Sequence, residues 1–181
     1  LKAVAELATG KYSKNKKPEF KSIIPPVPHG RQRIHGLFCG GTLSSEAQVV
    51  FLDQGVSVAS NAPIPGAEAL GSGTSHVLID LGSDEYTRGR PHPMIDPTVR
   101  DEELTKALAD TTLAVILLDV VIGFGAHPDP AGTIVQVVAA VGTERPIVVA
   151  SVTGTDDDPQ DRRTQMAKLV DGGIVVAPTN A

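Results

Sequence analysis

The residue types best suited to chemistry gather in the stretch DEYTRGRPHPMIDP, residues 84–97. Arg88 and Arg90 carry planar guanidinium groups that match the oxygens of a carboxylate or a phosphate. His92 lies between two prolines, which restrict its backbone, and an imidazole can donate a hydrogen bond or exchange a proton near neutral pH. We therefore predict that this stretch binds a small anion, with Arg88, Arg90 and His92 as its catalytic residues.

A purely structural interpretation of the same stretch is also open. The two arginines could pair with Asp84, Glu85 and Asp96 in an ion network that needs no ligand. The dipeptide Asp96-Pro97 is typical of a helix start, and it predicts a helix from Arg100. On this interpretation the stretch only connects two elements.

A glycine-rich turn, CGGTLSSEA at residues 39–47, is a second candidate. Gly40 and Gly41 let a ligand approach the backbone, Thr42 can cap the helix that follows, and the free N–H groups of a helix start favour phosphate or carboxylate. The sequence fits an ordinary strand-to-helix turn equally well. Cys39 is predicted to be a buried strand-end residue and not a nucleophile, because no histidine adjoins it.

The third candidate is LLDVVIGFGAHPDPAG, residues 117–132. Asp119 interrupts an apolar run, and a buried carboxylate needs a partner or a function. His127 follows in the loop, and we predict that both residues bind substrate or an anion. Because the spacing of His127 and His92 matches no metal-binding signature, no metal is predicted.

The fourth candidate is SVTGTDDDPQ, residues 151–160, which is rich in hydroxyl groups. Thr155 is the residue that we expect to contribute to anion binding. Asp158-Pro159 predicts a helix start, with Asp158 as the cap.

Short β-branched runs alternate with amphipathic stretches from residue 31 onward. This alternation predicts an α/β fold with three layers, an open parallel sheet between helices, in a flavodoxin-like strand order. Ligands of such sheets bind at the carboxyl ends of the strands, so the four loops are expected to form one anion site at one rim. The predicted strands are residues 34–39, 56–60, 76–80, 113–120, 146–152 and 174–177, and the predicted helices are residues 43–53, 100–109, 131–141 and 158–170.

The composition of the 181 residues limits the classes of function. A net charge of −5 gives no reason to expect nucleic acid, and no apolar run approaches the ~20 residues that cross a bilayer, so no membrane partner is expected. A single cysteine permits no disulfide within the chain, which favours a reducing, cytoplasmic location. We expect a basic, proline-rich linker or leader at residues 1–30 and one domain at residues 31–181.

Several motifs together resemble a known family. GGTLSSEA resembles the glycine-rich turn of the succinyl-CoA synthetase alpha subunit. DLGSDEYTRGRPHPMIDP, AVILLDVVIGFGAHPDPA, SVTGTDDDPQ and VVAPTNA resemble, in the same order, motifs of the FdrA proteins, over residues 31–181. The resemblance implies a flavodoxin-like domain of an acyl-CoA synthetase-like enzyme subunit. The CoA-binding domain that normally precedes it is not in this chain, so CoA could act only through another domain or subunit.

The resemblance also bears on the reaction. Synthetases of this superfamily carry phosphate on a histidine, but the matching residues 152–173 contain none, so a phosphohistidine is not expected. Some FdrA-type proteins are associated with oxamate carbamoyltransferase activity in allantoin catabolism, which implies carbamoyl phosphate and oxamate as substrates and other subunits as partners. Arg88 and Arg90 would then clamp the anion, and His92 would bond the carbamoyl oxygen. The alternatives are a CoA-dependent acyl-CoA ligase or transferase domain and a non-catalytic assembly domain.

Overall fold

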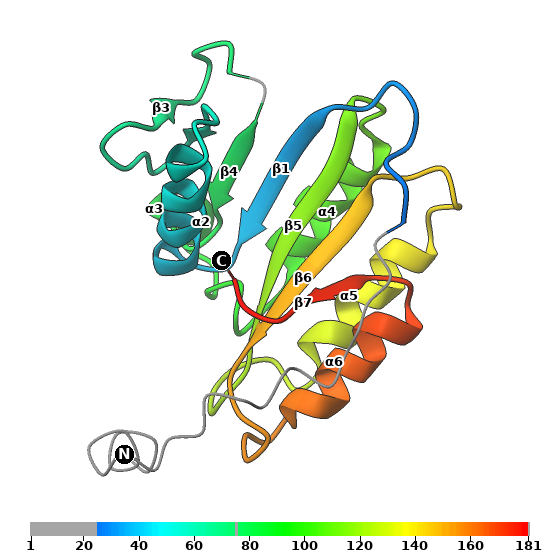
Figure 1. The fold of residues 1–181 in the computed structure, drawn as a ribbon. Helices are drawn as coiled ribbons and strands as arrows, with labels where there is room; N and C mark the ends of the chain where they lie inside the picture. Colours follow the sequence, from blue (N-terminus) through cyan, green and yellow to red (C-terminus); the bar gives the residue numbers. More distant parts are fainter. Residues whose placement is uncertain (1–24, 75, 181) are drawn as a thin grey trace, which may run out of the picture.

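The computed structural model describes residues 25–74 and 76–180, which form a seven-stranded, all-parallel sheet in the order β3-β2-β4-β1-β5-β6-β7 (Figure 1). Its five longer strands run β4-β1-β5-β6-β7, which is the flavodoxin order 2-1-3-4-5. The predicted open parallel sheet is therefore confirmed. The strands are β1 (Arg33–Phe38), β2 (Ala59–Ser60), β3 (Glu68–Ala69), β4 (Val77–Asp80), β5 (Leu113–Val121), β6 (Ile147–Thr153) and β7 (Val175–Ala177).

Helices cover the two faces unevenly. One face packs against α4, α5 and α6, whose buried side chains share a cluster with the strands, and Tyr86 of the short α3 joins this side. The other face packs against α2 through Ala47, which clusters with Phe38, Val58 and Leu78. The helices are α2 (Gly41–Asp53), α3 (Asp84–Thr87), α4 (Thr98–Ala109), α5 (Pro130–Ala139) and α6 (Arg162–Asp171).

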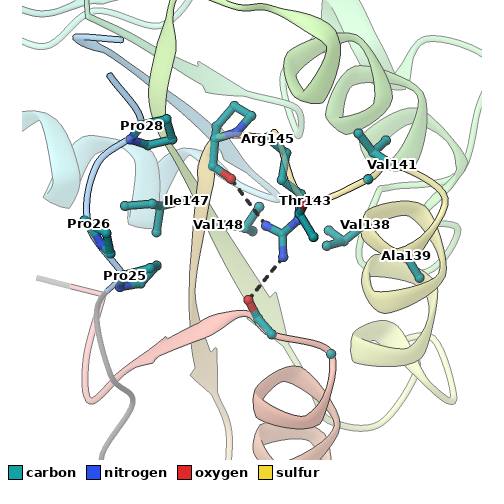
Figure 2. A pocket seen from close by; sticks show the side chains of 14 residues that line it. Pro25, Pro26, Pro28, Val138, Ala139, Val141, Thr143, Arg145, Ile147 and Val148 are labelled. Carbon is teal, nitrogen blue, oxygen red and sulfur yellow. Dashed lines mark hydrogen bonds between the residues drawn. The ribbon is translucent and has the colours of Figure 1, made fainter. Parts of the chain in front are cut away.

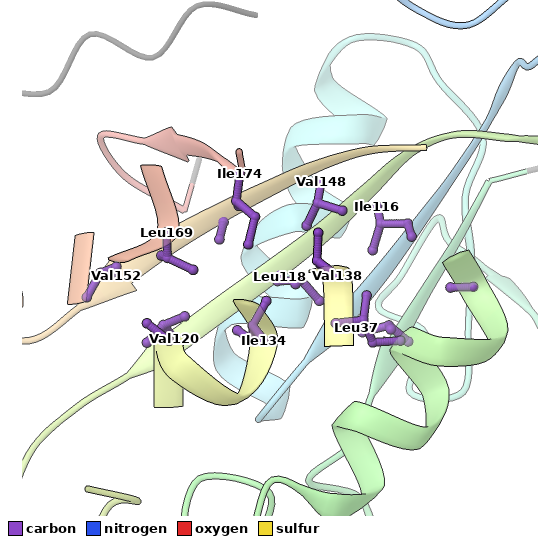
Figure 3. Packing of buried hydrophobic residues seen from close by; sticks show 14 of the residues in the cluster. Leu37, Ile116, Leu118, Val120, Ile134, Val138, Val148, Val152, Leu169 and Ile174 are labelled. Atoms are coloured by element: carbon purple, nitrogen blue, oxygen red, sulfur yellow. The ribbon is translucent and has the colours of Figure 1, made fainter. Parts of the chain in front are cut away.

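The larger core forms because alternate strand residues point to the same side of the sheet. Leu118 and Val120 of β5 and Val148 of β6 pack against Ile134 and Val138 of α5 (Figure 3). Aliphatic side chains of this kind are typical of a parallel sheet that helices cover. The rigid centre of the sheet holds the strand ends from which the predicted site loops leave.

The boundaries of most elements lie within one to three residues of the predictions, with two additions and one correction. The sequence analysis did not predict the short β3 and α3. The last long helix begins at Arg162 and not at Asp158, because the Asp158 carboxylate accepts bonds from the Thr155 amide (2.6 Å) and hydroxyl (3.0 Å) and so closes a turn. The cap is Asp161, whose side chain accepts a bond from the Thr164 amide at 3.2 Å.

Most of the predicted linker, residues 1–24, lies outside the described residues. Residues 25–28 run without regular structure and lead through a turn at residues 29–30 toward β1. Among the helices that the structure describes, none combines the length and the apolar character needed to cross a membrane.

Candidate functional site

A cavity of about 330 Å³ opens at the carboxyl ends of the central strands. It lies beside the point where the strand order reverses, since β1 has β4 as its neighbour on one side and β5 on the other. Open α/β sheets bind their ligands at such points. Its lining residues come from the carboxyl ends of β1, β5 and β6, from the first turn of α2 and from the loop between α3 and α4: Cys39, Gly40, Gly41, Thr42, Leu43, His92, Met94, Asp119, Val121 and Thr153.

The first turn of α2 forms one wall of this cavity. Gly40 is the N-cap and has no side chain to bond the helix, so the prediction that Thr42 caps α2 was wrong. The first backbone bond of the helix runs from the Ser44 amide to Gly40 O at 3.2 Å, and the amides of the three residues between have no carbonyl partner within the helix. These N–H groups and the helix dipole favour an anionic ligand in the cavity.

Asp119 forms the buried floor. Its side chain is 0% exposed, and Oδ1 accepts a hydrogen bond from the Cys39 amide at 2.7 Å. Oδ2 has no hydrogen-bond partner among the described residues. Burial raises the pKa of Asp119 to about 6, against the lowering effects of the Cys39 amide and thiol and of the Arg100 charge.

Arg100 is the buried cation behind this floor, and the sequence analysis did not identify it. The residue is 1% exposed, and its Nη2 donates to Thr133 Oγ1 at 2.6 Å and to Pro130 O at 3.3 Å. It also pairs with Asp101 at 3.2 Å. The helical spacing held a signal, because Arg100 stands four residues before Leu104, in line with the apolar side of α4.

Cys39 is buried at the end of β1, as predicted. Burial raises the pKa of its thiol, and the neighbouring Asp119 carboxylate raises it further. The thiol therefore stays protonated at neutral pH and is a poor nucleophile.

His92 enters the cavity from the loop after β4. Its Nδ1 accepts a bond from the Met94 amide at 3.2 Å, which places the proton of a neutral ring on Nε2. Nε2 packs against Gly82, where an added Cβ would stand 2.8 Å from it, 2.8 Å from Cys39 O and 3.1 Å from Asp80 Oδ1. This crowding holds His92 beside the ends of β1 and β4, with Nε2 as a hydrogen-bond donor.

Arg88 and Arg90 precede His92 but do not line the cavity. Both are exposed, and neither forms a salt bridge with another residue of the described ranges. The alternative ion network with Asp84, Glu85 and Asp96 is thus not found there. Asp96 instead accepts bonds from the Thr98 amide and hydroxyl, in keeping with its predicted role at a helix start.

His127 and Thr155 also lie outside the cavity lining. The His127 amide donates to Met94 O at 2.8 Å, so its loop buttresses the loop that carries His92. Gln160 fixes the same loop, since its side chain bonds Gly123 N and O (both 3.0 Å) and His127 O (3.2 Å). Thr155 is exposed and bonds Asp158. The structure thus brings together His92, Asp119 and the residues of the glycine-rich turn, but not the other four predicted site residues.

Four side chains of the lining were not predicted: the apolar Leu43, Met94 and Val121 and the hydroxyl-bearing Thr153. Their types carry no specific chemical signal, and only their places near strand ends, at a helix start or in the loop of His92 could have indicated them. Within the described residues, no group of three His, Cys, Asp or Glu side chains is arranged to hold a metal ion.

A larger hollow of about 570 Å³ lies near the amino end of β6 and is lined partly by Pro25, Pro26 and Pro28 (Figure 2). The guanidinium of Arg145 donates there to Pro146 O at 3.3 Å and to Gly173 O at 3.2 Å. One bond satisfies a carbonyl just after α6 and the other a carbonyl just before β6, which is a structural role. The hollow contains none of the predicted site residues, so the smaller cavity is the better candidate.

Comparisons with known proteins give the family of the chain. The chain is 38% identical, over 157 residues and 81% of its length, to the uncharacterized protein YahF of Escherichia coli (strain K12). The match spans 30% of that relative's length. The sequence model of the CoA-ligase family matches residues 37–181, which include every residue that lines the cavity. The chain therefore belongs to the CoA-ligase family, which supports its place in the acyl-CoA synthetase-like superfamily.

Proposed function

We propose that this domain binds a small anionic substrate in the cavity at the start of α2, as one part of a larger FdrA-type enzyme. The observation that carries the proposal is the uncapped first turn of α2 facing the same cavity as His92 and the buried Asp119. Phosphate or carboxylate oxygens would accept bonds from the free amides of that turn. Arg88 and Arg90 lie on the loop that carries His92, and we propose that they clamp the outer part of the ligand.

The reaction that we propose is transfer of a carbamoyl group between phosphate and oxamate. The amide nitrogen of oxamate forms a bond to the carbamoyl carbon, and the bond from that carbon to the phosphate oxygen breaks. Phosphate leaves with the electron pair, and the nitrogen gives up one proton to a base. His92 suits this chemistry because Nε2–H can donate to the carbamoyl oxygen, where negative charge develops.

Direct transfer also agrees with what the loop after β6 contains. Residues 152–173 hold no histidine that could carry phosphate. Orientation of two substrates and stabilisation of charge can by themselves supply a large part of a rate enhancement. No covalent intermediate on the protein is then needed.

Ligand-dependent melting of the whole chain tests the binding site. We expect carbamoyl phosphate and inorganic phosphate to raise the melting temperature, because a ligand at 100 times its dissociation constant adds about 2.7 kcal/mol to the free energy of unfolding. Gly41→Pro should reduce the rise, since proline keeps the first helical position and removes one of the three free amide donors, while the Asp80 carboxylate, 3.1 Å from the position of the added Cβ, must shift slightly. Gly142→Pro, far from the cavity lining, is the matched control for introducing a proline.

Turnover tests the reaction and requires the complete assembly. We expect His92→Asn and Arg90→Gln each to lower carbamoyl transfer by 10-fold or more, on the order of one lost transition-state bond. Unchanged turnover in both variants would contradict the proposed reaction while leaving the binding site open to the melting test.

The family match favours one alternative, a CoA-dependent acyl-CoA ligase domain. That route passes through a phosphorylated protein, so incubation with labelled nucleoside triphosphate separates the two. A stable phosphoprotein, or a rise in melting temperature with CoA alone, would replace carbamoyl transfer with ligation. A domain that only assembles other subunits would bind none of these small molecules.

A further inference from the structure

One buried acceptor in the cavity has no role in the proposed chemistry: Oδ2 of Asp119. It is fully buried, it belongs to a residue of the cavity lining, and no described residue donates to it. A hydrogen bond from the Cys39 thiol to the carboxyl group lowers its pKa, but Oδ2 itself has no hydrogen-bond partner among the described residues. An acceptor that is buried without a donor weakens a fold, so such atoms mark places where a ligand completes the bonding.

We infer that Asp119 determines specificity, and that it selects ligands that carry an N–H group next to an anionic group. This inference rests on the proposed anion site and names the substrate class of that site: small anions with an amide or carbamoyl nitrogen. The free backbone amides in the first turn of α2 are donors, which suit the anionic end. Asp119 offers an acceptor, which suits the nitrogen end.

The acidic Asp119 can belong to an anion site because the two charges, that of Asp119 and that of the ligand, are balanced at different ends of the cavity. The negative charge of Asp119 is offset from behind by the buried guanidinium of Arg100, which lowers the pKa of the carboxyl. The charge of the ligand lies instead against the amides of α2. A ligand with a methyl group in place of the amide NH₂ would leave Oδ2 without a hydrogen bond and without water. The loss of such a hydrogen bond lowers affinity by roughly 10- to 100-fold.

Asp119→Asn is a sharp test because its orientation is fixed. The Cys39 amide needs an acceptor at the position of Oδ1, so the oxygen of the asparagine stays there and its NH₂ takes the position of Oδ2. The acceptor is thereby replaced by a donor of nearly the same size. Asp110→Asn, which makes the same change before the amino end of β5 and outside the cavity lining, is the matched control.

The probes are phosphonoacetamide and phosphonoacetone, two stable phosphonates that differ only in NH₂ against CH₃, with inorganic phosphate as the reference anion. Calorimetric titration of the whole chain at about pH 8 keeps Asp119 ionised, since its pKa is about 6. We expect the amide to bind about 30-fold more tightly than the ketone. In Asp119→Asn this ratio should fall to about 3 or less without any weakening of phosphate binding, while the ratio in Asp110→Asn stays unchanged. Far-UV circular dichroism confirms that each variant folds.

Each other outcome overturns the inference in a recognisable way. Equal binding of the two phosphonates by the unaltered chain removes the selectivity but leaves the anion site. A ratio that survives in Asp119→Asn assigns the selectivity to another residue. Failure of both phosphonates and of phosphate to bind removes the anion site itself, and the inference with it.

Discussion

Two buried charges set the electrostatics of the cavity at the scale of single residues. Asp119 is fully enclosed, and the Arg100 guanidinium behind it is bonded to Thr133 and Pro130 of α5. Burial of an ionised group is costly unless partners compensate it, and Asp119 is compensated only in part. The domain therefore retains a group that weakens the fold at neutral pH, which is typical of a functional site.

The pH dependence of stability should reveal this group. The pKa of Asp119 is raised from the ordinary 3.8 to about 6, so the folded state holds the proton more strongly than the unfolded state. Its favourable contribution is complete below about pH 4 and is lost as the pH rises through about 6. We expect the free energy of unfolding of the unaltered chain, relative to Asp119→Asn, to fall by about 2–3 kcal/mol between about pH 4 and 7.5.

Urea unfolding at several pH values measures this difference. The subtraction removes the contributions of ionisable groups that are common to both proteins and do not interact with Asp119. A difference that does not change with pH would show that Asp119 titrates normally in the folded chain.

Gly82 is expected to tolerate no side chain. An alanine Cβ would stand 2.8 Å from Cys39 O and 2.8 Å from His92 Nε2, so backbone and ring must move. We expect Gly82→Ala to lower the free energy of unfolding by about 1–3 kcal/mol and to shift the His92 ring signals in NMR spectra. Gly142→Ala, where no atom lies within 4 Å, is the control and should change stability by about 0.5 kcal/mol or less. Equal effects of the two substitutions would contradict the crowding.

At the scale of elements, the loops at the rim support one another through side chains. Gln160, before α6, bonds backbone groups at both ends of the loop after β5. That loop in turn bonds Met94 O through the His127 amide. Gln165 of α6 accepts from the Ala131 amide at the start of α5 at 2.9 Å. The position of His92 thus depends on residues as distant in sequence as Gln160, and the backbone of His127 links the two loops.

Arg100 joins α4 to α5, and its loss should be costly. Arg100→Met keeps much of the apolar stem but leaves Thr133 Oγ1 and the Asp101 carboxylate without the Arg100 donor. We expect the free energy of unfolding to fall by about 3–5 kcal/mol, as in other buried pairs from which one partner is removed. Lys106→Met removes an exposed cation of the same helix that pairs with Glu103 and should cost less than about 1 kcal/mol. Chemical denaturation measures the free energy of unfolding of both variants. Similar losses in the two would show that Arg100 does not hold α4 to α5.

The elements were predictable where the pattern of apolar residues was strong, and the contacts between them were not. The run from Leu113 to Val121 could only be a buried strand, and its length was predicted to within one residue. The helix start predicted at Asp158 was wrong because the carboxylate of an aspartate can close a turn as readily as it caps a helix. Arg88 and Arg90 have the right chemistry, but only coordinates could show that they stand outside the cavity while Arg100 stands behind it.

At the scale of the whole molecule, the central strand depends on partners that are distant in sequence. β1 is paired with β4 on one side and with β5 on the other, and its residues Leu37 and Phe38 enter opposite cores. Without β5 and the helices that follow it, the larger core has lost most of its members. The cavity would then lack its floor as well, since Asp119 belongs to β5.

A chain that ends at residue 112 should therefore not fold. We expect its far-UV circular dichroism to lack the native sheet and helix signal and its backbone amides to exchange hydrogen without protection, because non-local pairing must offset chain entropy before it stabilises anything. The whole chain under the same conditions is the control. Native-like protection in the segment of β1 would show that β4 and α2 suffice to order it.

The order of the strands also has a consequence for synthesis on the ribosome. β1 emerges before β5, and the ribosome must add residues 39–112 before this partner strand begins, which takes roughly 4–15 s at about 5–20 residues per second. During that time the apolar end of β1 has only one possible neighbour strand. Nascent chains halted in this interval should be bound by holdase chaperones, and release should coincide with the emergence of β5.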